Sequence, residues 1–216
     1  MTNEKIKTLI FTRFERFWHW TQALLIIGMM FTGFGVNGAH DLLPYEAAAI
    51  LHRTAAWALM GLWVFALFWM LITGEWKQFI PTTEKIIEVA RYYSIDIFKA
   101  DAVHPYRKTR KYKHNPLQRI AYVGLMLLIM PMIWISGLLY FFYNDWAVIG
   151  LQDLTLANVA FVHVAAAFGM LIFFISHVYM VFTAKPVTKY LKAMLSGYEY
   201  VYPDKADQGR KSDEAG

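Results

Sequence analysis

The amino-acid sequence predicts an all-α membrane protein whose core is a bundle of four transmembrane helices. Apolar residues make up 57% of the 216 residues and aromatic residues 17%, a composition too apolar for an ordinary soluble domain. A helix needs about 20 predominantly apolar residues to cross a bilayer core. Four runs reach this length, and they cover residues 17–36, 47–73, 120–143 and 155–183.

The distribution of basic residues predicts how these helices are oriented. Lys and Arg are concentrated in the N-terminal segment, in the loop 75–119 and after residue 183, whereas the other two connections contain none. Because positively charged loops stay in the cytoplasm, we expect both chain ends on that side. The first apolar run is too long for a signal-peptide core, so we expect it to be kept as a helix.

The remaining segments are predicted to lie outside the bilayer. Thr82–Lys85 is typical of a helix start, and an apolar stripe follows it, which predicts a helix on the membrane surface or against a soluble partner. We treat residues 1–200 as one domain and expect the charged segment 201–216 to be a disordered cytoplasmic tail. Pro131 predicts a kink in the third helix. The stripe consists of Ile86, Ile87, Ala90, Tyr93 and Ile97.

Two histidines stand out in the last apolar run. His163 and His177 are fourteen residues apart, which on an α-helix places both within about 40° of one face and about 20 Å from each other. An ionisable residue inside a membrane is costly and marks a candidate functional site. Two imidazoles at this separation suit two haem irons stacked across a bilayer, and their partners should come from other helices.

Depth predicts which histidines meet. His19 begins a helix that runs outward, so it lies near the cytoplasmic side, and His52 begins a helix that runs inward from the outer side. The predicted pairs are therefore His52 with His163 outside and His19 with His177 inside. A single membrane histidine can instead bond a backbone carbonyl or relay protons, but the matching of all four favours haem ligation.

Three further residues fit this arrangement. Gly33 and Ala66 lie fourteen residues beyond His19 and His52, so each helix would offer a small residue to the other haem, although small residues are also common at transmembrane helix contacts. Arg53 is the basic residue next to His52 on the otherwise uncharged outer side. It is a candidate partner for a haem propionate, with a membrane-interface anchor as the alternative.

The residue types also exclude several kinds of chemistry. The chain has no cysteine, which excludes disulfides, thiol catalysis and cysteine-ligated iron–sulfur clusters. Zinc fits poorly because it needs three or four clustered ligands. A bis-histidine haem has no open iron position, so it transfers electrons without catalysis of its own.

His40, His104 and His114 lie in loops without matching partners, and we expect His40 and His104 at the surface.

Five short motifs, in order along the chain, resemble a known family. Over residues 12–197 the chain is similar to the di-haem cytochrome b subunits of respiratory formate dehydrogenases (the gamma subunits), nickel–iron hydrogenases and thiosulfate reductases. The resemblance implies two b haems held by the same two histidine pairs. The motifs are Arg16–Trp20 (RFWHW), Leu51–Arg53 (LHR), His114–Gln118 (HNPLQ), Phe161–Ala167 (FVHVAAA) and Ser176–Met180 (SHVYM).

The resemblance also implies partners and a quinone site. In this family the cytochrome sits in the bacterial cytoplasmic membrane and anchors a periplasmic module of catalytic, iron–sulfur or multihaem electron-transfer subunits. It passes electrons between that module and menaquinone or ubiquinone. The quinone site maps onto Asn115 and Gln118, level with His177, while a helix-start cap is a second role for Asn115 that can hold at once.

The resemblance favours one branch of this family. Residues 162–166 look more like formate dehydrogenase, whereas His114–Pro116 looks closer to the hydrogenase and thiosulfate reductase branches. We expect a formate dehydrogenase partner, with the other two enzymes as alternatives. A stand-alone transmembrane haem reductase would need an outer substrate site, and the outer connections are short. A haem-free proton-coupled transporter would use the same histidines, but no inverted repeat or discontinuous helix supports it.

Overall fold

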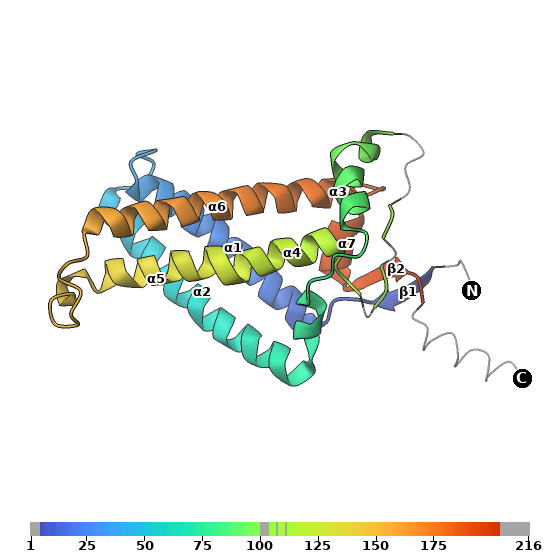
Figure 1. Cartoon of the computed structure of the whole chain (residues 1–216), viewed down its shortest axis with the longest axis horizontal. Coiled ribbons are helices and arrows are strands. Elements are labelled where there is room, and N and C mark those ends of the chain that lie inside the picture. The colour runs from blue at the N-terminus through green and yellow to red at the C-terminus, as the bar shows by residue number, and fades with distance from the viewer. Residues whose placement is uncertain (1–4, 100–103, 107, 111, 204–216) are drawn as a thin grey trace, which may run out of the picture. The chain divides into compact units, whose positions relative to one another are not determined.

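The structure is a computed structural model that describes residues 5–99, 104–106, 108–110 and 112–203. It is mostly helical, and four helices in this part of the chain are long and apolar enough to span a membrane (Figure 1). They are Arg13–Val36, Tyr45–Thr73, Pro116–Phe141 and Leu156–Phe182. The prediction of a mostly helical chain with four candidate membrane spans is confirmed.

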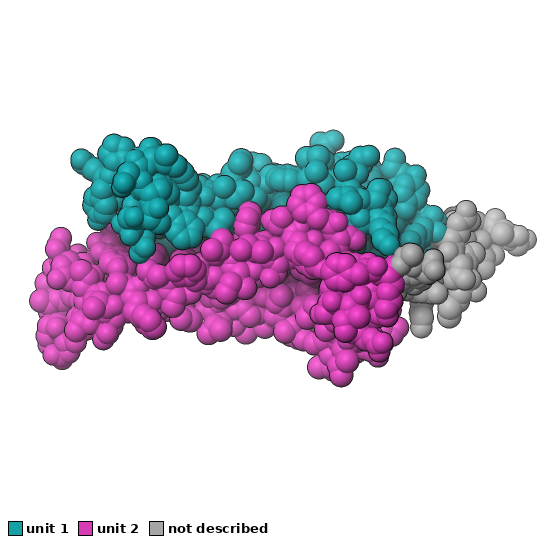
Figure 2. All heavy atoms as spheres, turned by 90° about the horizontal axis from the view of Figure 1, so that it is seen from above, with its two compact units in different colours: residues 1–78, 107–113, 184–216 teal, residues 79–106, 114–183 magenta. Residues whose placement is uncertain are grey.

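The chain folds as two compact units, which Figure 2 colours separately. Unit 1 contains residues 1–78, 107–113 and 184–216, and unit 2 contains residues 79–106 and 114–183. Each unit contributes two of the four candidate membrane spans.

Helices α1 (Arg13–Val36) and α2 (Tyr45–Thr73) pack against each other in unit 1. A capping box begins α1: the Thr12 hydroxyl accepts from the Glu15 N–H at 3.3 Å, and the Glu15 carboxylate accepts from the Thr12 N–H at 2.7 Å. This cap explains why α1 starts four residues before the apolar run. Gly74 ends α2 with a φ of 74°, a left-handed conformation that suits glycine.

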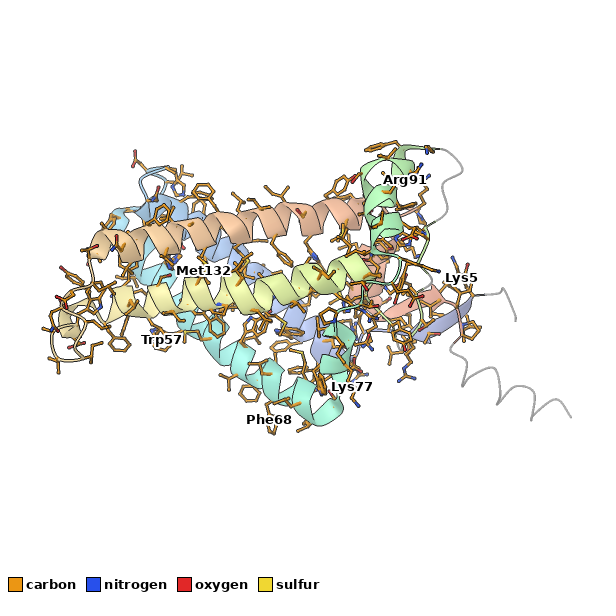
Figure 3. The ribbon with its side chains drawn as sticks, in the orientation of Figure 1. Lys5, Trp57, Phe68, Lys77, Arg91 and Met132 are labelled. Carbon is orange, nitrogen blue, oxygen red and sulfur yellow. The ribbon has the colours of Figure 1, made fainter. Side chains whose placement is uncertain are left out.

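The outer surface of α2 is strongly apolar. Trp57 and Phe68 are 46% and 62% exposed and project from the helix (Figure 3). The lysines labelled in the same unit, Lys5 and Lys77, lie outside the two spanning helices. Large exposed apolar surfaces mark membrane or partner contacts, and this division of apolar and basic residues suits a helix surrounded by lipid.

A two-stranded antiparallel sheet in unit 1 pairs a segment near the N-terminus with a segment near the C-terminus. Sequence analysis did not predict this sheet. Strand β1 (Ile6–Leu9) pairs with β2 (Tyr198–Val201), with Ile6 opposite Val201. Helix α7 (Lys189–Ser196) precedes β2. Strands of four residues are too short for their alternation to stand out in a sequence. Val201 therefore belongs to a strand, and residues 204–216 of the expected disordered tail lie outside the described residues.

Glu199 fixes strand β2 to the loop that precedes the third span. Its side chain is 3% exposed, and its carboxylate forms ion pairs with Lys108 and, at 3.2 Å, with Lys189. Burial lowers the pKa of Lys108, and the Glu199 carboxylate opposes this shift. A buried charge of this kind is tolerated because it is paired on both sides.

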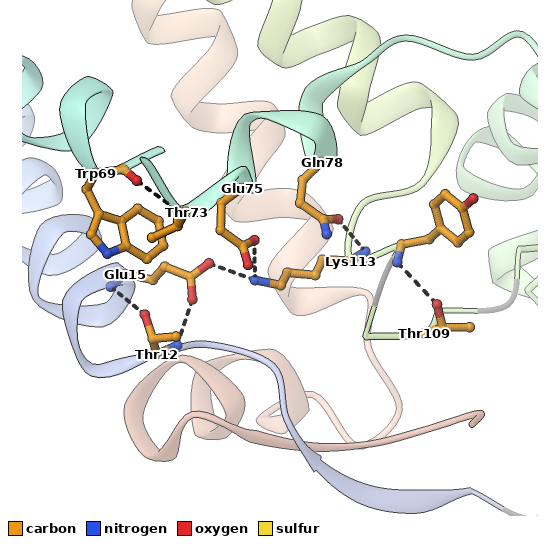
Figure 4. A network of polar contacts seen from close by, with 9 residues as sticks. Thr12, Glu15, Trp69, Thr73, Glu75, Gln78, Thr109 and Lys113 are labelled. Carbon is orange, nitrogen blue, oxygen red and sulfur yellow. Dashed lines mark hydrogen bonds and ion pairs between the residues drawn. The ribbon is translucent and has the colours of Figure 1, made fainter. Parts of the chain in front are cut away.

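Lys113 connects three segments of unit 1 (Figure 4). Its Nζ lies 2.8 Å from the Glu15 carboxylate at the start of α1 and 2.8 Å from the Glu75 carboxylate in η1 (Glu75–Phe79). Its backbone N–H donates to the Gln78 side chain at 3.0 Å. Only 5% of the Lys113 side chain is exposed. This one buried residue therefore ties the start of α1 and the short helix η1 to the loop that precedes α4.

The third span of unit 2 is continuous but changes its helical geometry in the middle. Helix α4 (Pro116–Gly124) leads through the π-helical turn η3 (Leu125–Ile129) into α5 (Met130–Phe141). Pro131 has no N–H for an i−4 hydrogen bond, and its ring crowds the preceding turn. The irregularity expected at Pro131 thus takes the form of a π-helical turn just before it.

The fourth span, α6 (Leu156–Phe182), packs against α5. The short helix η4 (Tyr143–Asp145) lies in the connection between them. Thr155 caps the start of α6 by accepting from the Asn158 N–H at 3.2 Å, which sets its first residue.

Helix α3 (Ile86–Ser94) is the short helix expected in the central loop, followed by η2 (Asp96–Phe98). It packs against α4 within unit 2 and buries Val89 and Tyr93, whereas Ile87 is 77% exposed. An exposed Ile87 agrees with a stripe that faces the membrane or a partner, whereas Tyr93 of the stripe packs inside unit 2 together with Val89. In η2 the Asp96 carboxylate accepts a hydrogen bond from Lys99, which lowers the pKa of Asp96.

Candidate functional site

His52 of α2 is held against one turn of α1. Its Nδ1 lies 3.1 Å from the Met29 carbonyl oxygen and 3.1 Å from the Thr32 hydroxyl. A Cβ on the next residue, Gly33, would lie 3.2 Å from the imidazole Cε1. Glycine at this position therefore lets the imidazole approach the α1 backbone.

His163 of α6 is held by the same device on α5. Its Nδ1 lies 2.9 Å from the Ser136 hydroxyl, and a Cβ on the next residue, Gly137, would lie 3.3 Å from its Cε1. Each of the two units thus presents a hydroxyl residue followed by glycine to one histidine. We call His52 and His163 the hydroxyl-held histidines.

These contacts fix the protonation pattern of both imidazoles. A carbonyl oxygen such as that of Met29 can only accept, so Nδ1 of His52 carries the proton. The Ser136 hydroxyl donates to the Met132 carbonyl at 2.6 Å, so it accepts from Nδ1 of His163. In a neutral imidazole Nε2 then holds the lone pair, and this is the form in which histidine binds a metal. Both residues are suited to ligate haem iron.

The contacts described for the other two histidines are with aromatic rings, and His163 also meets the ring of Tyr140 edge-on at 5.7 Å. His19 of α1 meets the ring of Trp20 edge-on, with 5.2 Å between centroids. His177 of α6 is stacked with Phe173 at 6.1 Å and an interplanar angle of 12°. We call these the ring-contacted histidines.

Comparison with known proteins identifies the class of molecule. A family model described as prokaryotic cytochrome b561 matches residues 10–197. The chain belongs to this family. It is 26% identical over 207 residues to an Escherichia coli (strain K12) protein named as a cytochrome, YdhU, and the match covers 91% of this chain and 76% of that protein. No solved structure gives a significant match.

Membership makes this chain a membrane b-type cytochrome, and the cofactor that the family implies is haem b. The fixed Nδ1–H of His52 and of His163 fits that cofactor, because a ligating histidine usually donates its other ring N–H to a neighbouring acceptor. That His52 and His163 ligate one haem, and His19 and His177 the other, stays a prediction. Each predicted pair takes one residue from each unit. Arg53 is exposed on α2 next to His52, and its role toward a propionate also stays a prediction.

In the cytochrome, the small residues predicted to face the haems have specific surroundings. Gly33 makes room for the imidazole of His52, and its predicted role of making room for the other macrocycle stays a prediction. Ala66 is fully buried on α2.

Asn115 and Gln118 form the N-terminal cap of α4. The Asn115 side-chain oxygen accepts from the Gln118 N–H at 2.9 Å, and the Gln118 side-chain oxygen accepts from the Asn115 N–H at 3.0 Å. The cap role of Asn115 is thereby confirmed. Since the cap uses the amide oxygens, side-chain N–H groups can serve as donors to another molecule: those of Gln118, and one of Asn115, whose Nδ2 also lies 3.2 Å from the Tyr93 oxygen.

A series of ring contacts in unit 2 connects this cap with His177. Phe173, which is stacked with His177, lies 5.9 Å from Tyr122, and Tyr122 lies 5.1 Å from His114. His114 directly precedes Asn115 in the chain. Three ring contacts thus separate His114 from His177, and the position of Asn115 level with His177 stays a prediction.

Sequence reasoning missed a polar cluster beside the cap. The phenol oxygen of Tyr93 lies 3.2 Å from Asn115 Nδ2 and 3.2 Å from His104 Nε2. His104 is half-buried in this cluster, so its assignment to the surface is wrong. His40 is half-buried too, with Nε2 2.9 Å from the Phe31 carbonyl oxygen. The sequence signal for Tyr93 was its place in the predicted apolar stripe, which pointed to packing and gave no hint of polar contacts.

Proposed function

We propose that this b-type cytochrome binds two haems and transfers electrons between an outward-facing redox module and membrane quinone. The observation that carries the proposal is the shared geometry of His52 and His163. Depth along the sequence predicts that these two histidines, one from each unit, bind the same haem. Both have Nδ1 held by a hydroxyl residue that precedes a glycine.

The second haem is proposed between His19 and His177. Each of these residues lies fourteen positions from a residue of the first site, Gly33 or His163, on its own helix. That offset separates the two sites by about 20 Å along a helix axis. Two bis-histidine irons at this spacing form a path for electrons, in which the protein positions each iron and adjusts its potential.

The quinone is proposed to bind beside His177, where Asn115 and Gln118 can donate amide N–H groups to a quinone carbonyl. The ring contacts from His177 to His114 support this position. The redox module is proposed to be a formate dehydrogenase, on the likeness of residues 162–166 to that branch. A nickel–iron hydrogenase or a thiosulfate reductase is the alternative partner.

Oxidation of the reduced cytochrome by a menaquinone analogue tests this function. Purified protein with its haems is reduced, mixed with the analogue, and followed by visible absorbance. We expect rapid oxidation, and slower oxidation with full haem content in Asn115→Leu and Gln118→Leu. Asn158→Leu is a control, because the Asn158 side chain lies at the start of α6 and is exposed. Haem that quinone does not oxidise would contradict the quinone role, and loss of haem from the two variants would contradict the site.

A further inference from the structure

Tyr93, His104 and Asn115 form a hydrogen-bonded cluster that the capping of α4 does not require. Tyr93 is 9% exposed and Asn115 4% exposed. Asn115 Nδ2 donates to the Tyr93 oxygen at 3.2 Å, and His104 Nε2 lies 3.2 Å from the same oxygen. A phenol oxygen that accepts from both neighbours has its own proton directed toward a third position.

His104 can exist in two protonation states in this setting. The Tyr106 N–H donates to His104 Nδ1 at 3.0 Å, so in the neutral ring Nδ1 accepts and Nε2 carries the proton toward Tyr93. In the imidazolium form Nδ1–H has an acceptor as well, the Tyr106 carbonyl oxygen at 3.2 Å. A histidine with a partner for either state is suited to take up and release protons near neutral pH.

The position of Tyr93 is fixed from several sides. Its carbonyl oxygen accepts from the Tyr179 hydroxyl at 3.1 Å, two residues after His177 on α6. The titratable and charged groups around His104 include Tyr92, whose ring lies 4.7 Å away, Tyr93, and Arg119, which donates to the Tyr106 hydroxyl at 3.4 Å.

We propose that Tyr93 and His104 are the proton-delivery pair of the quinone site. This inference rests on the quinone function proposed above. Two acceptors that share the NH₂ group of one amide lie about 5 Å apart, a distance that one water molecule bridges. A quinone oxygen bound to the second N–H of Asn115 is therefore within reach of the Tyr93 hydroxyl through one water.

One quinone takes two electrons, one from each of two ferrous haems, and two protons, one on each carbonyl oxygen, to become quinol. At the oxygen bound to Asn115, an O–H bond forms with a proton from the bridging water, the water is restored as the O–H bond of Tyr93 breaks, and the Nε2–H of the His104 imidazolium moves to the Tyr93 oxygen, which leaves a neutral imidazole with its proton on Nδ1. The other quinone oxygen takes its proton from water. His104 then regains a proton from bulk water.

Oxidation of the reduced full-length cytochrome by a menaquinone analogue, measured against pH in H₂O and D₂O, tests the pair. General acid groups contribute about 100-fold or more to such rates, so Tyr93→Phe should slow oxidation about 100-fold. His104→Gln keeps a polar group beside Tyr93 but does not titrate, and it should flatten the pH profile around neutrality. Tyr92→Phe, one residue away on α3, is the matched control and should behave as wild type.

Further measurements separate this inference from a purely structural role. Haem content and melting temperature of Tyr93→Phe should equal those of Tyr92→Phe, and infrared difference spectra of ¹⁵N-histidine-labelled protein should show a histidine signal that His104→Gln lacks. Equal rates and pH profiles in Tyr93→Phe and Tyr92→Phe would overturn the inference. If Tyr93→Phe does not fold, a wild-type reaction without a solvent isotope effect would overturn it. Haem that quinone does not oxidise in the wild type would instead reject the proposed function itself.

Discussion

The hydroxyl-held and ring-contacted histidines are the same residue type in helices of the same kind, but their neighbours differ. His52 and His163 donate from Nδ1 to oxygen atoms of a packed helix, whereas His19 and His177 contact the rings of Trp20 and Phe173. An acceptor at Nδ1 makes an imidazole a more basic ligand. We therefore expect the Thr32 and Ser136 hydroxyls to lower the potential of the haem at His52 and His163. Residues that do not touch iron thus adjust the potential of this haem.

Removing the Lys113 ammonium group should have the largest effect on the fold. Of the two haem sites, it should affect the ring-contacted one. Lys113→Met leaves the buried Glu15 carboxylate and the partly exposed Glu75 carboxylate without their cation, and breaking a buried pair in this way costs about 3 kcal/mol. Glu15 lies one turn before His19, so the haem at the ring-contacted site should be lost first on heating. Thermal melts in detergent, followed by haem absorbance, measure both effects.

Lys77→Met is the control for this prediction, because Lys77 is an exposed lysine in the same short helix as Glu75. It should melt like the wild type. Equal melting of the two variants would mean that the Lys113 contacts do not hold α1 in place.

Removing a hydroxyl acceptor should affect only the hydroxyl-held site. Changes to residues that orient a metal ligand weaken metal binding by about 10-fold or more, so Ser136→Ala and Thr32→Val should each lose haem from that site more readily and raise its potential. A redox titration of both haems measures the shift. Thr54→Val removes a hydroxyl that bonds only the Ile50 carbonyl of its own helix and should leave both potentials unchanged. A shift in the ring-contacted haem instead would reverse the assignment.

Adding a methyl group beside these histidines should have the smallest effect. In Gly33→Ala and Gly137→Ala the new Cβ lies 3.2 and 3.3 Å from an imidazole carbon, so the ring must shift, at a cost of about 1 kcal/mol. Gly28→Ala is the matched control on α1, because a Cβ there meets nothing within 4 Å. Haem retention during chaotrope titration should fall in the first two variants. Identical retention in all three would show that close approach at Gly33 and Gly137 is unimportant.

The features that the sequence predicted are those encoded within one segment. The four apolar runs, the order of the histidines along each helix and the Asn115 cap each depend on residues that are neighbours in the chain. The capping box before α1 is local as well, and its Thr-x-x-Glu pattern ahead of the apolar run was available to sequence reasoning.

The features that were missed depend on contacts between distant segments. Strands β1 and β2 are about 190 residues apart in sequence, and Lys113 meets Glu15 and Glu75 only after folding. Thr32 and Ser136 look like ordinary polar residues of membrane helices, because the rotation of one helix against its neighbour decides which histidine they face. His104 was placed at the surface because no periodic pattern connects it with Tyr93.

The number of haems per chain tests the central claim most directly. A pyridine haemochrome assay on the purified protein, expressed with ample haem, should give close to two b haems per chain. Replacing His52 or His163 by Ala should leave about one, with the remaining haem at the ring-contacted site, and replacing His19 or His177 should leave the other. A wild-type protein without stoichiometric haem, or with a haem content unchanged by these substitutions, would contradict the account.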